Sequence, residues 1–233
     1  GFTNMLQRLV REESPDYLAV VFDAKGPTFR HEAYGDYKAT RKPMPEDLGG
    51  QLEDVFSILD AMGVARFAIE GYEADDVLAT IARRSASDRK DIEVYLVSSD
   101  KDLKQVLTDR IRIYNSRTHK VLDAAGLVTE EGLTPAQIPD YLALVGDTSD
   151  NVPGVSGIGE KTALRLLSEF GSIEGILANL SRVYATRVRQ ALENGREAAF
   201  FSRRLTTLAE VPMEFRLEEC RRRDTERARL AAL

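Results

Sequence analysis

The sequence predicts an α/β unit with a mostly parallel sheet flanked by helices, followed by an all-helical unit. In the first part, short apolar runs alternate with amphipathic segments, which is typical of parallel strands covered by helices on both faces. After about residue 130, apolar residues recur at helical spacing only, in segments separated by Gly, Pro or Ser. We therefore expect two units, residues 1–130 and 131–233.

The elements of the first unit follow from the spacing of apolar residues. Strands are expected at 17–22, 66–69, 92–97 and 111–114. Helices are expected at 2–11, at 52–62 with Gly63 as its stop, just after Gly71, and from Leu103. Residues 24–45 are polar, basic and interrupted by prolines, which indicates an excursion outside the core.

The second unit contains helical segments only. They are 134–146, 160–171, 172–180 and 182–195. The last twenty residues, 214–233, have the composition of a helix without a closed ending, which favours a fragment of a longer protein.

The composition is that of an ordinary soluble globular protein, with 43% hydrophobic and 30% charged residues. No apolar run has the length of a membrane span, so we expect no membrane partner. The single cysteine, Cys220, allows no internal disulfide and favours the cytoplasm. The net charge of −6 argues against nucleic acid, but basic residues dominate one stretch and could meet a polyanion there. They are Lys25, Arg30, Lys38, Arg41 and Lys42.

Eight carboxylates in four short motifs are the strongest functional signal. They are Asp23, then Glu73, Asp75 and Asp76, then Asp100 and Asp102, and finally Asp147 and Asp150. The first and third groups follow predicted strands, whose carboxyl ends are where α/β sheets bind ligands. Carboxylates gathered this closely repel each other unless cations neutralise them, and Mg²⁺ or Mn²⁺ prefers such oxygen ligands. The alternative is that each group caps a helix or lies on a solvated face.

The chemistry that such a cluster favours is hydrolysis of a phosphodiester by metal-activated water. Two metal ions would stabilise the attacking and leaving oxygens, and the products would be a 5′-phosphate and a 3′-hydroxyl. No Ser/His/Asp set is evident, and neither His31 nor His119 has a second histidine or a cysteine nearby.

Two further segments are suited to phosphate. Gly154, Gly157 and Gly159 precede a predicted helix with a spacing that fits a helix–hairpin–helix grip on a DNA backbone, or else a plain glycine-rich turn. The segment FRHEAYGDYKATRK (29–42) mixes aromatic and basic side chains, which favours single-stranded nucleic acid. A solvated basic face is the alternative there.

Together these motifs resemble the flap endonuclease family, which includes the 5′–3′ exonuclease domain of bacterial DNA polymerase I. The motifs that carry the resemblance are VVFDAKGPTFRHEAYGDYKATR, GYEADD, SSDKDLKQ and GDTSDNVPGVSGIGEKTA. It implies a PIN-like sheet, a helical arch at about 25–48, and a helix–hairpin–helix-like (H3TH) module. It also implies cleavage of DNA at 5′ ends and flaps in primer removal and repair.

The resemblance assigns residues to roles. Asp23, Glu73, Asp75 and Asp76 would lie on the side of a first Mg²⁺ or Mn²⁺, and Asp100, Asp102, Asp147 and Asp150 would serve the shared region and a second ion. Tyr37, Lys38 and Arg41 would engage the scissile phosphate and the 5′ strand, with Arg30 and Lys42 as further DNA contacts. The hairpin, where the family can place K⁺, would hold the duplex through Gly154, Val155, Ser156, Gly157, Ile158, Gly159, Lys161 and Thr162.

The implied partner is branched or nicked DNA with a 5′ end or flap, rather than a small molecule. A monomer near the nucleoid, attached to a polymerase domain, is expected. Family members begin with a strand that ends in a metal-binding aspartate, whereas this sequence starts within the following helix. That departure leaves open a non-catalytic DNA-binding remnant, and the acidic edge alone would also suit a PIN-type ribonuclease.

Overall fold

The strands form two separate sheets in the computed structural model, which describes residues 1–41 and 46–223. In one sheet, β1 (Ala19–Val21) pairs in parallel with β2 (Ala65–Phe67). In the other, β3 (Val94–Leu96) pairs in parallel with β4 (Ile111–Asn115), and β4 pairs antiparallel with β5 (Lys120–Leu122). The predicted strands and the α/β class are confirmed, but a single sheet was expected.

The antiparallel strand β5 was not predicted from the sequence. A short turn joins it to β4. The side-chain oxygen of Asn115 accepts hydrogen bonds from the backbone N–H groups of Arg117 and Thr118, at 3.0 and 3.2 Å. An Asn that bonds to its own following backbone closes a tight turn, and a tight turn can join only antiparallel strands.

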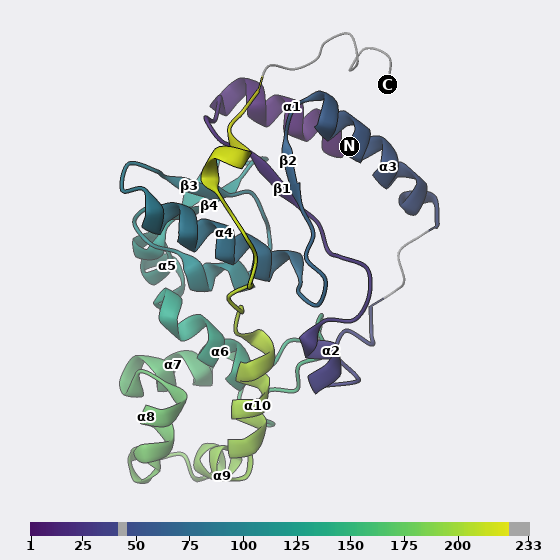
Figure 1. Cartoon of the computed structure of the whole chain (residues 1–233). Helices are drawn as coiled ribbons and strands as arrows, with labels where there is room; N and C mark the ends of the chain where they lie inside the picture. The colour runs from purple at the N-terminus through teal and green to yellow at the C-terminus, as the bar shows by residue number, and fades with distance from the viewer. Residues whose placement is uncertain (42–45, 224–233) are drawn as a thin grey trace.

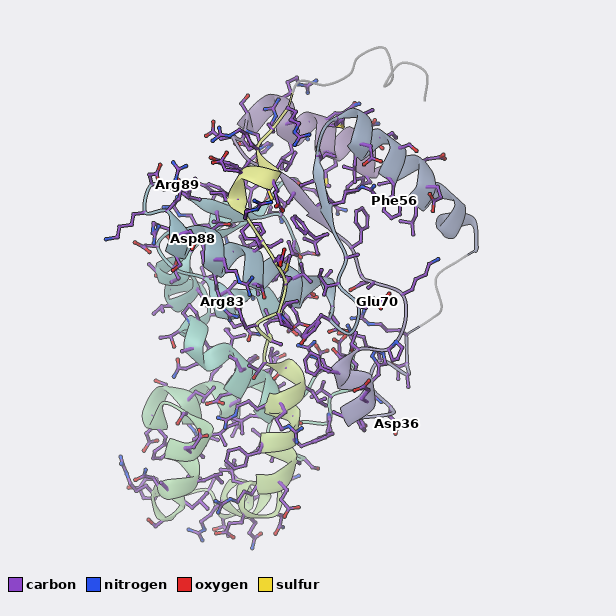
Figure 2. The ribbon with its side chains drawn as sticks, viewed as in Figure 1. Asp36, Phe56, Glu70, Arg83, Asp88 and Arg89 are labelled. Atoms are coloured by element: carbon purple, nitrogen blue, oxygen red, sulfur yellow. The ribbon has the colours of Figure 1, made fainter. Side chains whose placement is uncertain are left out.

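Helices cover the first sheet on one side. Figure 1 shows α1 (Phe2–Glu13) and α3 (Glu46–Ala61) beside β1 and β2. Their contact is apolar, and Phe56 of α3, labelled in Figure 2, meets Phe22 edge to face with ring centroids 5.0 Å apart. Gly63, the predicted stop of the second helix, has a φ of +65°, a conformation that favours glycine.

The segments between the sheets and the helical half carry the candidate site. They include α2 (Phe29–Ala33), α4 (Ala74–Asp88) and the 3₁₀ turn η1 (Asp102–Val106). Residues 42–45 of the predicted arch, among them Lys42, lie outside the described residues.

The helical half packs around the largest apolar cluster. After α5 (Ala124–Glu131), which closes the first half, its elements are η2 (Pro135–Gln137), α6 (Ile138–Val145), α7 (Glu160–Phe170), α8 (Ile173–Ala178), η3 (Leu180–Arg182), α9 (Thr186–Asn194) and α10 (Arg196–Thr206). Leu107 and Leu127 of the first half also belong to this cluster, so the apolar core is continuous across the division expected at residue 130.

Helix α10 was not among the helices expected from the sequence, although its residues are amphipathic. Its buried residues are Ala199, Ser202, Leu205 and Thr206, so a small or polar side chain occupies most of its inward face.

The prediction of a helix over 214–233 is wrong for the part that the structure describes. Residues 214–223 are irregular apart from the 3₁₀ turn η4 (Leu217–Cys220). The backbone N–H of Leu18 donates to the Cys220 carbonyl at 2.7 Å, and that of Arg222 donates to the Asp16 carbonyl at 2.9 Å. These long-range bonds replace helical ones. Among residues 1–41 and 46–223, no helix is both long and apolar enough to cross a membrane.

Candidate active site

Two of the four acidic motifs meet where β1 ends. Asp23 lies two residues beyond β1, and its Oδ1 accepts a hydrogen bond from the backbone N–H of Ala74 at 2.8 Å. Ala74 is the first residue of α4, so this bond holds the end of the strand against the helix turn that carries Asp75. The expectation that Asp23 and the GYEADD motif share one edge is consistent with this contact.

The other two acidic motifs line one cavity of about 230 Å³. Its walls are Ser99, Asp100, Lys101, Asp102, Asp147, Ser149 and Asp150. The loop that supplies Asp147 and Asp150 is closed by two backbone hydrogen bonds between Asp147 and Val152, at 2.9 and 2.7 Å. Four carboxylates from two distant segments therefore face one small space.

Burial and the crowding of carboxylates raise the pKa values of Asp75 and Asp102. Burial, followed by the charges of Asp100 and Asp102, raises the pKa of Asp75 to about 7. Burial and the charges of Asp100 and Asp147 likewise raise the pKa of Asp102 to about 7. These raised pKa values mean that the ionised carboxylates repel one another, and a bound cation would offset that repulsion.

Ion pairs divide the eight carboxylates into two sets. Glu73, Asp76, Asp147 and Asp150 each contact a lysine or arginine. Asp23, Asp75, Asp100 and Asp102 have no such ion pair within the described part of the chain. The unpaired set comes from the end of β1, the first turn of α4 and the segment that links β3 to η1.

Lys101 was overlooked in the sequence, although it stands inside the SSDKDL motif. Its Nζ lies 3.0 Å from Asp147 Oδ2 and joins the two acidic segments of the cavity. Burial acts to raise the pKa of Asp147, but the hydrogen bonds from Ser149 and Lys101 outweigh it and lower that pKa. The signal was the lysine between two aspartates.

The structure places Asp76, one of the predicted metal ligands, against Arg30 and away from the acidic cavity. The side chain is fully buried, at 0% exposure. Its two oxygens accept hydrogen bonds from Arg30 at 2.6 and 2.8 Å, from Ala209 N–H at 2.8 Å and from Glu73 N–H at 3.2 Å. Helical spacing suggested that Asp76 and Glu73 face the same way, which is true, but Asp76 faces an arginine and not the cavity.

The DNA-contact prediction for Arg30 is wrong because Arg30 is buried in the same contact. Only 2% of Arg30 is exposed, so its guanidinium cannot reach a nucleic acid bound at the surface. The nearby charges of Asp76 and Glu73 hold the Arg30 pKa above its usual value against the effect of burial. Composition alone could not separate this buried arginine from its exposed neighbours.

Tyr37, Lys38 and Arg41 all reach the acidic side chains. The Tyr37 hydroxyl lies 3.0 Å from both Glu73 Oε2 and Asp150 Oδ2, and the residue is 4% exposed. Lys38 Nζ contacts Glu73 and lies 3.6 Å from Asp150 Oδ2. Tyr37 thus positions carboxylates, while a direct contact with phosphate remains a prediction for Lys38 and Arg41.

Lys38 and Arg41 stand at the rim of the site. Lys38 has a φ of +55°, unusual for a residue with a side chain, and its backbone N–H donates to the Asp150 carbonyl at 3.0 Å. Arg41 Nη2 lies 2.5 Å from Asp150 Oδ1, and half of the Arg41 side chain is exposed. Both cations are anchored to the loop of Asp147 and Asp150, next to the unpaired carboxylates.

The donor set suits a divalent metal, although it is not drawn together around one. Among the described residues, no three His, Cys, Asp or Glu side chains are grouped as a metal ion would require. One observation favours a cation all the same: Asp102 Oδ1 is buried and has no hydrogen-bond partner. A buried, unpaired carboxylate oxygen among repelling carboxylates fits an oxygen-binding metal.

The predicted hairpin has a buried base and an exposed tip. Val155 and Ile158 are 3% and 4% exposed, so their side chains anchor the loop, and contacts with DNA would be limited to their backbone. Ser156, Gly157, Gly159 and Lys161 are exposed, and Thr162 is half-buried. These exposed residues precede or begin α7.

Gly154 is not a phosphate contact. It is buried, and its N–H donates to Ser202 Oγ at 3.1 Å. A Cβ at this position would lie 2.5 Å from the backbone nitrogen of Gly146. Glycine is needed here because two chain segments cross, so that prediction is wrong.

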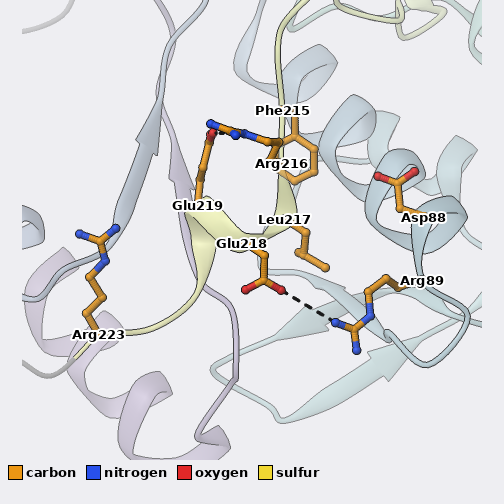
Figure 3. A pocket seen from close by; sticks show the side chains of 8 residues that line it. All are labelled: Asp88, Arg89, Phe215, Arg216, Leu217, Glu218, Glu219 and Arg223. Carbon is orange, nitrogen blue, oxygen red and sulfur yellow. Dashed lines mark hydrogen bonds and ion pairs between the residues drawn. The ribbon is translucent and has the colours of Figure 1, made fainter.

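A larger cavity, of about 580 Å³, contains none of the predicted site residues. It lies between the end of α4 and the C-terminal segment (Figure 3). Four of its charged side chains pair with one another, Arg216 with Glu219 at 2.9 Å and Arg89 with Glu218 at 3.9 Å, while Asp88 and Arg223 lie on opposite sides of the cavity in Figure 3. It therefore offers no convergent set of unpaired polar groups, and the acidic cavity remains the candidate site.

Comparisons with known proteins identify the family and the fold of the chain. A model of the 5′-3′ exonuclease N-terminal resolvase-like domain matches residues 1–132, and one of the 5′-3′ exonuclease C-terminal SAM fold matches residues 133–228. The thermostable DNA polymerase I of Thermus thermophilus is 43% identical over 227 residues, covering 97% of this chain and 27% of that protein. DNA polymerase I of Pseudomonas aeruginosa is 41% identical, covering 100% and 26%. The chain thus spans about a quarter of these relatives.

Solved structures show the same fold. A bacteriophage T5 flap endonuclease in a pseudo-enzyme-product complex with DNA and metal ions has a TM-score of 0.76 and 25% identity, covering 89% of this chain and 79% of that one. The catalytic core of Rad2 in complex with DNA substrate has a TM-score of 0.63 and 15% identity, covering 99% and 76%, and supports the fold alone. By its fold and by both family models, the chain belongs to the 5′-3′ exonuclease family.

Proposed function

We propose that the chain is a divalent-metal-dependent nuclease that hydrolyses DNA phosphodiesters at 5′ ends and 5′ flaps. One observation carries the proposal: four carboxylates without ion pairs lie near one another, two of them in the acidic cavity, and two cations are tied to Asp150 of the same cavity. The carboxylates are Asp23, Asp75, Asp100 and Asp102, and the cations are Lys38 and Arg41. Family membership and likeness to metal-bound and DNA-bound nucleases support it.

The unpaired carboxylates would hold the metal ions, with Asp147 and Asp150 completing the oxygen shell. Two Mg²⁺ or Mn²⁺ ions bound there would activate water and neutralise charge on the phosphate oxygens. Glu73 would join them when its contact with Lys38 opens. Asp76 is excluded from this set because Arg30 and backbone amides occupy its oxygens.

Lys38 and Arg41 would hold the scissile phosphate against the acidic edge. Each is tied to Asp150, so the two positive groups lie at one side of the cavity. A phosphate between them would exchange a carboxylate partner for a phosphoryl oxygen without leaving either cation unpaired. Their charge would also oppose the repulsion between an incoming polyanion and the carboxylates.

The exposed tip of the hairpin would hold duplex DNA by its backbone. Gly157 and Gly159 leave room for a phosphate to approach main-chain N–H groups, and Lys161 adds a charge at the start of α7. We also propose K⁺ at this hairpin, a monomeric state, and an attached polymerase domain as in the relatives. The role would be primer removal and repair near the nucleoid.

The test is cleavage of a labelled duplex carrying a 5′ flap, with Mg²⁺, Mn²⁺ or EDTA. Cutting that needs metal and leaves a 5′-phosphate supports the proposal. Asp75→Asn should abolish it, whereas Asp91→Asn, a substitution at the surface beside Arg89, should not. Binding without cutting under both metals would contradict the nuclease function and support a DNA-binding module. Preference for single-stranded RNA would support a ribonuclease instead.

A further inference from the structure

Arg30 connects three parts of the molecule from a fully buried position. Its Nη atoms donate to the two oxygens of Asp76 on α4, and Nη1 lies 3.2 Å from Glu73 Oε2. Its Nε donates to the carbonyl of Leu205 at 2.7 Å, and Nη2 to that of Thr207 at 3.0 Å. Each of the five guanidinium N–H groups therefore has an acceptor, which the three N–H groups of a lysine could not match.

Asp76 is equally saturated, and its bonds determine where α4 begins. Besides Arg30, it accepts from the backbone N–H of Glu73, the residue that caps α4, and from Ala209 of the C-terminal segment. Glu73 and Asp75 flank this contact in the same helix turn. The Asp76 side chain thus sets the position of both neighbouring carboxylates relative to the segment after α10.

The segment after α10 is held along α4 and η1 by side chains in place of a partner strand. Figure 1 shows it running from α10 across α4 toward α1. Thr80 Oγ1 accepts from Val211 N–H at 2.9 Å. Gln105 donates to the Thr206 carbonyl at 3.0 Å and accepts from Leu208 N–H at 2.9 Å. We call residues 205–213, which are the last two residues of α10 and the segment that follows it, the strap.

We infer that Arg30 and Asp76 are positioning residues. They fix the acidic edge, by which we mean the carboxylates of Glu73 and Asp75 at the start of α4, relative to the strap and, through the strap, relative to the helical half. This rests on the proposed nuclease function. A buried ion pair is often no more stabilising than two apolar side chains of similar size. What the apolar pair cannot reproduce is the bidentate geometry and the bonds to Glu73, Leu205, Thr207 and Ala209.

A double substitution separates position from stability. Arg30→Met with Asp76→Leu removes both charges together, so no buried charge is left unpaired, as it would be in either single variant. The measurements are unfolding in urea, Mn²⁺ binding by calorimetry, affinity for flap DNA in EDTA, and kcat and KM for cleavage. We expect a folded protein with unchanged DNA affinity, roughly 10-fold weaker Mn²⁺ binding, and kcat lower on the order of 100-fold.

The matched control is the pair Arg203 and Asp140, which joins α10 to α6 within the helical half at 3.0 Å. Arg203→Met with Asp140→Leu should leave Mn²⁺ affinity and kcat unchanged. If the Arg30/Asp76 variant folds and keeps the parent's Mn²⁺ affinity and kcat, the pair only stabilises the fold and the inference is overturned.

Arg30→Lys provides a second route if the double variant does not fold. This substitution keeps the positive charge but loses the planar guanidinium that bonds both oxygens of Asp76. Mn²⁺ affinity and kcat should therefore fall while the protein stays folded, and parental values of both would overturn the inference. If the parent binds Mn²⁺ but cuts no DNA, the nuclease proposal fails, and the calorimetric comparison still decides whether Arg30 and Asp76 position the edge.

Discussion

Replacing Asp102 by asparagine should stabilise the metal-free protein while removing its response to metal. Asp102 Oδ1 is buried without a partner, and burial together with Asp100 and Asp147 raises the pKa of this carboxyl to about 7. Asparagine has nearly the same shape and no charge, so it removes the repulsion. Residues that bind metals commonly destabilise the fold in this way when no metal is bound.

The magnitude follows from the pKa, which rises from 3.8 to about 7. One pKa unit corresponds to about 1.4 kcal/mol, so ionised Asp102 costs up to about 4 kcal/mol of folding free energy at pH 8. The neighbouring carboxylates share this cost and relax when one charge is lost, and the new amide must still find a partner. We therefore expect Asp102→Asn to gain about 2 kcal/mol, or roughly 4–8 °C in Tm for a chain of this size.

The pH dependence has a defined sign. In the unfolded chain this carboxyl loses its proton near its ordinary pKa, whereas in the folded protein it keeps the proton up to about pH 7. The parent therefore loses this part of its stability as the pH rises through that window, and the asparagine variant does not. The advantage of Asp102→Asn should be small at pH 4.5 and complete at pH 8.

The assay is urea unfolding in EDTA at both pH values, repeated with Mn²⁺ at pH 8. Mn²⁺ should stabilise the parent and have much less effect on Asp102→Asn. Asp91→Asn is the control, because the hydrogen bond from Arg89 lowers the pKa of Asp91 and its removal should bring no gain. An Asp102→Asn protein no more stable than the parent in EDTA at pH 8, or equally favoured at pH 4.5, would refute the reasoning.

Three further predictions concern other parts of the chain. Lys38→Ala should slow flap cleavage on the order of 100-fold while DNA affinity in EDTA changes little, and equal losses in both would argue against a role at the scissile phosphate. Gly154→Ala should destabilise the fold by about 3 kcal/mol or more in urea unfolding, because φ is +67° and the new Cβ meets Gly146 at 2.5 Å. Gly49→Ala in α3, where nothing lies within 4 Å, should not; similar values for both would contradict the steric argument. The Cys220 thiol is 4% exposed, and burial together with Glu219 raises its pKa to about 11. It should therefore react with a disulfide reagent at pH 8 only after unfolding, and rapid labelling of the native protein would show the burial to be wrong.

Local pattern was enough for the strands and most helices of the first half. The apolar runs ending near Asp23 and Asp100 are strands because short apolar segments between polar ones have few alternatives in a soluble chain. The position of those aspartates just after strands was therefore readable in the sequence. So were the stop at Gly63 and the acidic loop of Asp147 and Asp150.

The roles of individual charged residues were not readable in the same way. Arg30 and Lys38 belong to one basic stretch, yet one is buried against α4 and the other stands at the rim. Asp75 and Asp76 are adjacent, yet only Asp75 remains without an ion pair. Which member of such a pair is buried depends on partners that are 46 to 133 positions away along the chain, such as Asp76 for Arg30 and Ala209 for Asp76.

The sequence alone determined that several carboxylates lie at strand ends, and that the chain has a basic stretch and a glycine-rich hairpin. Each of these features is contained within a few consecutive residues, so local pattern is enough to find it. Only the tertiary structure decided which carboxylates stay free for a metal and which become part of the scaffold. The physical reason is that an ion pair forms where backbone elements bring opposite charges together away from water. In this chain, α2, the first turn of α4 and the strap meet at Arg30, and that meeting removes Asp76 from the site.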